Sequence, residues 1–176
     1  MHAVKTRHFL QLVLLSALWG ASFLFIRVAS PVLGPNVMAA LRIGLATLTL
    51  MGIMRWAGEP WPWRHWRELL GLGTLTVAAP FLLYAWAALH LPAGYSSLLN
   101  TMAVPFGVIA AAWMKEDTLS ARKWAGCLCG FAGVALIVQL GPVEPTPALL
   151  TAAAACVTAS ACYGISTTWV KRATQR

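Results

Sequence analysis

The sequence predicts an all-α integral membrane protein with six transmembrane helices. Of its 176 residues, 59% are hydrophobic and 10% are charged, whereas ordinary soluble domains carry about 25% charged residues. Only helices and closed barrels can cross a bilayer, and continuous apolar runs of about 17–25 residues fit helices. Such runs cover residues 9–26, 37–54, 69–89, 93–114, 124–140 and 148–170.

The positions of the 13 lysines and arginines predict how these helices are oriented. Eleven of them lie before the first run, between the second and third, between the fourth and fifth, or after the sixth. These four segments face the same side, so the positive-inside rule places both termini in the cytoplasm. The net charge of +8 is then explained by the membrane topology, and nucleic acid is not an expected partner. We expect a multi-pass protein of the cytoplasmic (inner) membrane.

A segment of the first run recurs in the sixth. "SALWGASFLFIRVA" (residues 16–29) aligns with "SACYGISTTWVKRA" (residues 160–173) at a constant offset of 144, and Gly20 pairs with Gly164. Because the copies lie in the first and the sixth runs, an offset of five, they cross the membrane in opposite directions, as in inverted-repeat transporters. A chance resemblance between two helices rich in small residues is the alternative. On the first reading, residues 1–145 form a five-helix repeat and residues 146–176 begin a second, truncated repeat.

Two prolines lie near the middle of adjacent runs. Pro80 and Pro105 lack an N–H and free the carbonyls of Thr76 and Thr101, four residues earlier. Broken helices at this depth line substrate cavities or act as hinges. Ordinary kinks whose free carbonyls are satisfied by neighbouring groups are an equal alternative.

Arg42 is the charged residue inside a run, about 9 Å along the helix from Asn36. Its side chain can extend to the outer surface, or it can face a cavity and hold a substrate carboxylate or a helix C-terminus. Other polar or aromatic side chains lie deep enough to line such a cavity, although a hydrogen bond between helices is the alternative for each polar one. These candidates are Trp19, Ser22, Tyr84, Trp86 and Asn100.

The fifth run carries Gly126, Gly130 and Gly133 on one stripe. Small residues at this spacing let two membrane helices approach closely. We therefore expect these glycines to pack against another helix.

The remaining chemistry argues against an enzyme. All five acidic residues lie in connections or at the ends of runs, and none of the four histidines lies deep in a run. No mid-membrane carboxylate is therefore expected for proton coupling, and no metal cluster or Ser–His pair. The four cysteines lack metal-ligand spacing. We expect no catalytic residues, metal or cofactor.

Three stretches, taken in order, resemble the EamA-type branch of the drug/metabolite transporter superfamily. They are "LLSALWGASFLFIRVA", "AALRIGLATLTL" and "APFLLYAWAALHLPAGYSSLLNTMAVPFGVIAAAWMKEDTLSARKWAGCLCGFAGVALIV". The resemblance implies ten helices in two inverted five-helix repeats around a central substrate site. It also implies that Lys115 stands where the family usually has glycine. The family's motif positions correspond here to Trp19 and Gly20, Arg42, Pro105, and the acidic residue of the cytoplasmic mouth, Glu116.

We therefore expect a secondary transporter, or a fragment of one, that exports or exchanges small organic metabolites by alternating access. Its expected partners are the lipid bilayer, a small-molecule substrate, and a missing second half or an oligomeric partner. The resemblance implies a chain whose length is about twice the 144-residue offset. We therefore expect a partial chain that is inactive by itself. A non-transporting membrane scaffold or assembly partner is the alternative, in which Arg42 and the kinks serve packing alone.

Overall fold

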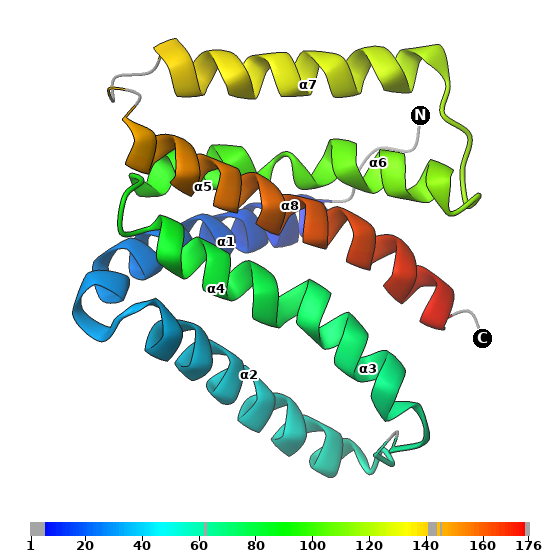
Figure 1. The fold of residues 1–176 in the computed structure, drawn as a ribbon. Coiled ribbons are helices and arrows are strands. Elements are labelled where there is room, and N and C mark those ends of the chain that lie inside the picture. The colour runs from blue at the N-terminus through cyan, green and yellow to red at the C-terminus, as the bar shows by residue number, and fades with distance from the viewer. Residues whose placement is uncertain (1–5, 62, 141–143, 145, 175–176) are drawn as a thin grey trace.

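The computed structural model describes residues 6–61, 63–140, 144 and 146–174 (Figure 1). Every regular element in these ranges is a helix, which confirms the predicted all-α fold class. In chain order the elements are α1 (Thr6–Leu33), α2 (Pro35–Ala57), η1 (Trp63–His65), α3 (Trp66–Gly73), the π-helical turn η2 (Thr74–Ala78), α4 (Ala79–Ala87), α5 (Ala93–Asn100), α6 (Ala103–Trp113), α7 (Ala121–Leu140) and α8 (Pro147–Thr174).

Five helical segments in the described ranges are long and apolar enough to cross a membrane. They coincide with the first four predicted runs and the sixth: Thr6–Leu33, Pro35–Ala57, Trp63–Ala87, Ala93–Trp113 and Pro147–Thr174. The fifth run falls on α7, which has 20 residues. That α7 crosses the membrane stays a prediction, as does the cytoplasmic location of the termini.

The connection between α1 and α2 is shorter than the sequence suggests. The stretch "SPVLGPN" (residues 30–36) predicts a turn-rich connection, but α1 continues through Pro31 to Leu33, and α2 begins at Pro35. Gly34 makes the turn with a φ of +80°, a conformation that strains residues with a side chain. Pro35 suits the start of α2 because the first N–H of a helix has no partner within the helix.

The third and fourth predicted spans are interrupted close to their prolines. In the third, the Ala79 N–H bonds the carbonyl of Thr74, five residues back, so a π-helical turn directly precedes Pro80. In the fourth, α5 ends at Asn100 and α6 begins at Ala103. The Thr101 carbonyl that Pro105 cannot bond accepts the Val104 N–H instead, at 3.1 Å. This second break is satisfied locally, whereas the hinge roles of Pro80 and Pro105 stay predictions.

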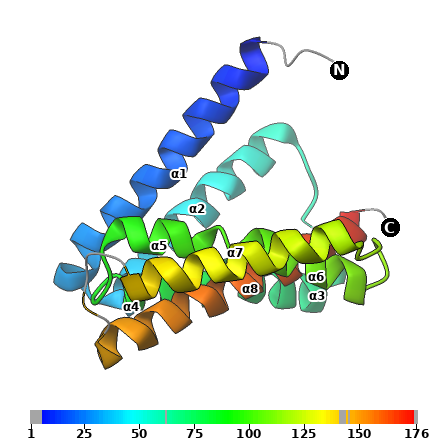
Figure 2. The same cartoon turned by 90° about the horizontal axis from the view of Figure 1, so that it is seen from above.

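α8 lies at the centre of the bundle, where it packs against α4, α5 and α6 (Figure 1). Its buried face is built mainly from small residues such as Ala152, Cys156 and Ala159, which let neighbouring backbones come close. The N-terminal part of α1 leaves the bundle (Figure 2). The large apolar side chains there, from Phe9 to Trp19, are more than half exposed, as suits a helix surrounded by lipid.

Candidate functional site

A buried polar cluster joins α4, α5 and α8 beside the break between α5 and α6. The Tyr84 hydroxyl donates to Oδ1 of Asn100 at 2.9 Å and lies 2.9 Å from Oγ of Ser160. Ser160 in turn lies 2.9 Å from the carbonyl of Leu99. Because a buried hydroxyl needs a hydrogen-bonding partner, this cluster holds α4, α5 and α8 in one register. Two of the predicted cavity residues, Tyr84 and Asn100, are therefore brought together.

Arg42 faces the interior of the bundle. The central carbon of its guanidinium lies 4.0 Å from the ring centroid of Phe81 on α4, an arrangement that the ring's negative face favours. Its charge also acts on Tyr163 of α8, whose ring stacks on that of Tyr84 with centroids 6.3 Å apart. The guanidinium thus lies beside α4 within electrostatic range of α8, and the geometry favours the inward-facing alternative.

The other predicted cavity residues lie apart from this group. Trp19 is 55% exposed on α1 and Ser22 is half-buried on the same helix. Trp86 is 37% exposed and places its ring edge-on to that of His90, with centroids 5.3 Å apart. A cavity-lining role for Trp19, Ser22 and Trp86 stays a prediction.

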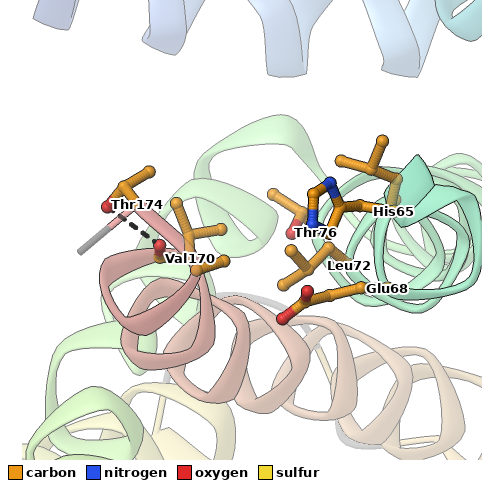
Figure 3. Close-up of a pocket in the computed structure, with 9 residues that line it drawn as sticks. His65, Glu68, Leu72, Thr76, Val170 and Thr174 are labelled. Atoms are coloured by element: carbon orange, nitrogen blue, oxygen red, sulfur yellow. Dashed lines mark hydrogen bonds between the residues drawn. The ribbon is translucent and has the colours of Figure 1, made fainter. Parts of the chain in front are cut away.

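A pocket of about 640 Å³ opens between α3 and the C-terminal end of α8 (Figure 3). Thr76, in the π-helical turn, lines it, and its hydroxyl oxygen is buried with no hydrogen-bond partner in the described part of the chain. π-helical turns are frequent at functional sites, and an apolar pocket with a few polar groups is the usual form of a ligand site. Figure 3 labels six of the residues that line the pocket: His65, Glu68, Leu72 and Thr76 on one side, and Val170 and Thr174 on α8.

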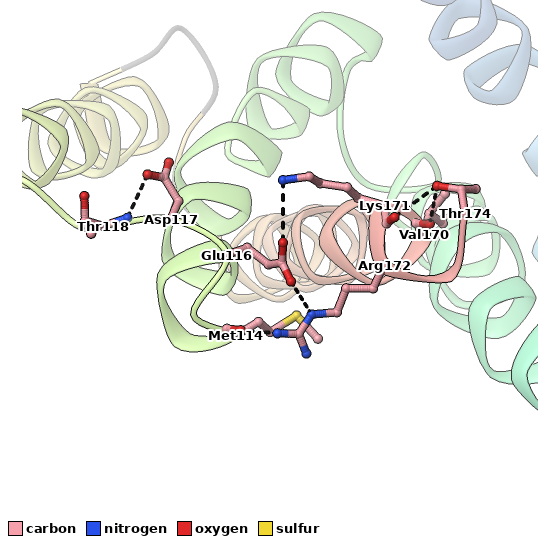
Figure 4. A network of polar contacts seen from close by, with 8 residues as sticks. All are labelled: Met114, Glu116, Asp117, Thr118, Val170, Lys171, Arg172 and Thr174. Carbon is pink, nitrogen blue, oxygen red and sulfur yellow. Dashed lines mark hydrogen bonds and ion pairs between the residues drawn. The ribbon is translucent and has the colours of Figure 1, made fainter. Parts of the chain in front are cut away.

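Glu116 ties the end of α6 to the end of α8 (Figure 4). Its carboxylate accepts a hydrogen bond from Nε of Arg172 at 2.6 Å and lies 3.6 Å from Nζ of Lys171. Arg172 also donates to the carbonyl of Met114, at the end of α6. We call these contacts of Glu116, Lys171, Arg172 and Met114 the α6–α8 latch.

The latch holds the pKa of Glu116 below its usual range, chiefly through the hydrogen bond from Arg172. A carboxylate with a lowered pKa stabilises the fold above the ordinary glutamate pKa, and that contribution is lost as the pH falls through the lowered value. Glu116 is therefore ionised at neutral pH, the form that pairs with Arg172 and Lys171.

The EamA-like transporter family matches residues 8–139. The chain belongs to this family. Its members are transporters rather than enzymes, which confirms the expectation that this chain is not an enzyme.

Two relatives from Archaeoglobus fulgidus are both named uncharacterized transporter. One is 32% identical over 153 residues, which cover 80% of this chain and 49% of the relative. The other is 24% identical over 128 residues, which cover 73% of this chain and 46% of the relative. The EamA-like chain therefore spans about half the length of these relatives. No solved structure matches it.

Lys115 is the position at which the resemblance to the family implies glycine, and the backbone here has a conformation that suits glycine. Lys115 has a φ of +59°, in the left-handed region. Its N–H bonds the carbonyl of Ala112 at 3.0 Å, and the N–H of Glu116 bonds that of Ala111 at 2.8 Å. This pattern is the Schellman ending of a helix, in which glycine is preferred. The turn places Glu116 beside α8.

Replacing Lys115 by glycine is expected to stabilise the chain by about 1 kcal/mol, because it removes the left-handed strain. Lys115→Ala is the matched control, since alanine also removes the charge but keeps the Cβ. Unfolding of both variants in detergent, monitored by tryptophan fluorescence, measures the difference. Equal stability of the two variants would contradict the backbone explanation.

Close helix packing occurs at different glycines from those that the sequence suggested. A Cβ added to Gly126, Gly130 or Gly133 would meet nothing within 4 Å in the described part of the chain. A packing role for these glycines therefore stays a prediction. By contrast, a Cβ on Gly164 would lie 2.6 Å from both the Gly107 nitrogen and Cβ of Phe106. The tight crossing is therefore between α6 and α8.

Sequence reasoning missed the site residues on α8, although a signal for them existed. Ser160, Tyr163 and Gly164 all lie in the second copy of the repeated segment. Each contacts an earlier helix: Ser160 and Tyr163 contact Tyr84 on α4, and Gly164 contacts α6. The repeat was a signal, because the offset of 144 pairs Tyr163 with Trp19, a predicted cavity residue.

Proposed function

We propose that this chain provides part of the substrate path of a secondary transporter that exports or exchanges small organic metabolites by alternating access. The observation that carries the proposal is the position of the C-terminal end of α8. This end forms one wall of the 640 Å³ pocket and is also held to α6 by the latch. Movement of one element against its neighbours around a site is how inverted-repeat transporters alternate access.

In this proposal residues 1–145 are the first five-helix repeat, and residues 146–176 begin the second. The 144-residue offset supports it, as does the coverage of about half of each Archaeoglobus relative. A second half, or an oligomeric partner, completes the unit in the cytoplasmic (inner) membrane. The clustering of basic residues on one side of the runs supports cytoplasmic termini.

The test uses a joined protein, in which this chain is fused to the unmatched half of the 32% identical relative. Liposomes containing the joined protein, the chain alone or no protein are loaded with labelled organic anions, amines and neutral solutes. We expect saturable counterflow of at least one solute with the joined protein, and background flux with the chain alone. A folded, membrane-inserted joined protein that exchanges no solute class would instead support a scaffold or assembly role.

A further inference from the structure

Arg42 is a membrane-embedded cation without a counter-ion. In the ranges that the structure describes, its guanidinium takes part in no ion pair and no hydrogen bond; its contacts are the Phe81 ring and the electrostatic interaction with Tyr163. Two arginines at the ends of spans are bonded. Arg27 donates to the carbonyl of Ala88, and Arg172 pairs with Glu116. Arg42 differs because nothing in the described fold neutralises its charge.

An unpaired guanidinium in a membrane span is costly. The hydrocarbon core does not solvate the charge as water does. A cation–π contact offsets only part of that cost. A charged group kept at this depth without a partner is by default a functional site. Its natural complement is an anion, because the guanidinium fork matches a carboxylate with two parallel hydrogen bonds.

The groups around Arg42 indicate what kind of anion fits. Phe81 presents the face of its ring to the guanidinium, and Tyr163, whose ring stacks on that of Tyr84, lies within electrostatic range of the charge. The Tyr163 hydroxyl is a further hydrogen-bond donor near the same charge. The surroundings are therefore aromatic and carry positive charge, and the acidic residues of the sequence lie in the connections or at the ends of the runs.

We propose that Arg42 binds the carboxylate of an organic anion with an aromatic or other apolar body, which packs beside Phe81 and Tyr163. This inference rests on the proposed transport function, for which it names a substrate class. The site at Arg42 is separate from the 640 Å³ pocket, whose lining residues do not include Arg42. Arg42 is the charge anchor, and the aromatic rings select the body of the solute.

Binding to the purified full chain in maltoside micelles tests the site. The probes are phenylacetate, its neutral amide phenylacetamide, and the cation phenethylamine, compared by calorimetric titration. We expect phenylacetate to bind and phenylacetamide to bind at least about tenfold more weakly, because the amide lacks the charge-assisted hydrogen bonds. Arg42→Gln should remove this preference, while Arg42→Lys should retain part of it.

The matched control is Arg55→Gln, which makes the same chemical change at an exposed position of the same helix and should leave binding unchanged. Each variant is first shown to elute and unfold like the wild type. Equal binding of the three probes, no binding of phenylacetate by the folded wild type, or unchanged binding by Arg42→Gln would overturn the proposal.

A phospholipid phosphate is the other anion that could reach Arg42. The titration is therefore repeated in phosphatidylcholine nanodiscs, since maltoside carries no phosphate. Retained phenylacetate binding supports the solute, whereas binding that is lost in nanodiscs assigns Arg42 to the lipid and overturns the proposal.

Arg42-dependent binding without counterflow by the joined protein would contradict only the transport function. Counterflow of neutral or cationic solutes that is the same in the wild type and in Arg42→Gln would contradict only the anion site.

Discussion

Replacing Gly164 by alanine is expected to lower the free energy of unfolding by about 1–3 kcal/mol, the usual cost of overpacking. The new Cβ would lie 2.6 Å from both the Gly107 nitrogen and Cβ of Phe106, and 2.7 Å from the Phe106 carbonyl carbon. Backbone atoms cannot rotate away as a flexible side chain can, so α6 and α8 must separate. Titration of the chain with SDS in mixed micelles, followed by tryptophan fluorescence, measures the loss.

Gly20→Ala is the matched control, because Gly20 is the partner of Gly164 in the repeated segment. A Cβ at Gly20 would meet nothing within 4 Å in the described ranges, and both glycines lie within long helices. We expect a change within about 0.5 kcal/mol, as for other substitutions without a packing effect. Equal losses at the two positions would show that the α6–α8 crossing is not the cause.

Reversing the charge of Glu116 is expected to open the α6–α8 latch. Glu116→Arg replaces the carboxylate between Lys171 and Arg172 with a third cation, so attraction at 2.6 Å becomes repulsion. We expect the population of open molecules to rise about fivefold or more, at the lower end of ordinary coupling between two states. Spin labels at the exposed positions Thr118 and Thr174, in a chain whose cysteines are replaced, report the separation by electron paramagnetic resonance.

The double variant Glu116→Arg with Arg172→Glu restores opposite charges at the latch with the two residues exchanged. We expect it to recover most of the closed population, although Arg172 also loses its bond to the Met114 carbonyl. Glu144→Arg reverses an acidic residue at another connection and should leave the distance unchanged. A distance distribution that is the same in all these variants would show that the latch does not hold the two helices.

The sequence was sufficient to predict the helical class and the two interrupted spans, because these follow from composition and from single residues. Long apolar runs in a bilayer must be helical, and Pro80 and Pro105 each prevent a backbone hydrogen bond. The connection after α1 was predicted less well. Pro31 is an ordinary signal for a helix end, yet α1 continues to Leu33 and the turn rests on Gly34 alone.

The sequence could not predict which residues contact one another, because these contacts depend on which helices pack together. Tyr84 and Asn100 were singled out as cavity candidates, with a hydrogen bond between helices as the alternative. They bond to each other, and the Tyr84 hydroxyl also lies 2.9 Å from Oγ of Ser160. The glycine stripe at Gly126 has the spacing of a packing face, yet the tight crossing lies at Gly164. Local spacing shows that a face can pack closely, but only the arrangement of the whole bundle shows what packs against it.

The most direct measurement of the central claim is counterflow by the joined protein at equal protein amount, compared for the wild type, Glu116→Arg and the charge-exchanged double variant. If the chain forms part of a substrate path in which the C-terminal end of α8 moves against α6, the wild type exchanges solute saturably. Exchange then falls in the single variant and recovers in the double variant. Absence of exchange by the folded wild type, or exchange that is identical in all three proteins, would contradict it.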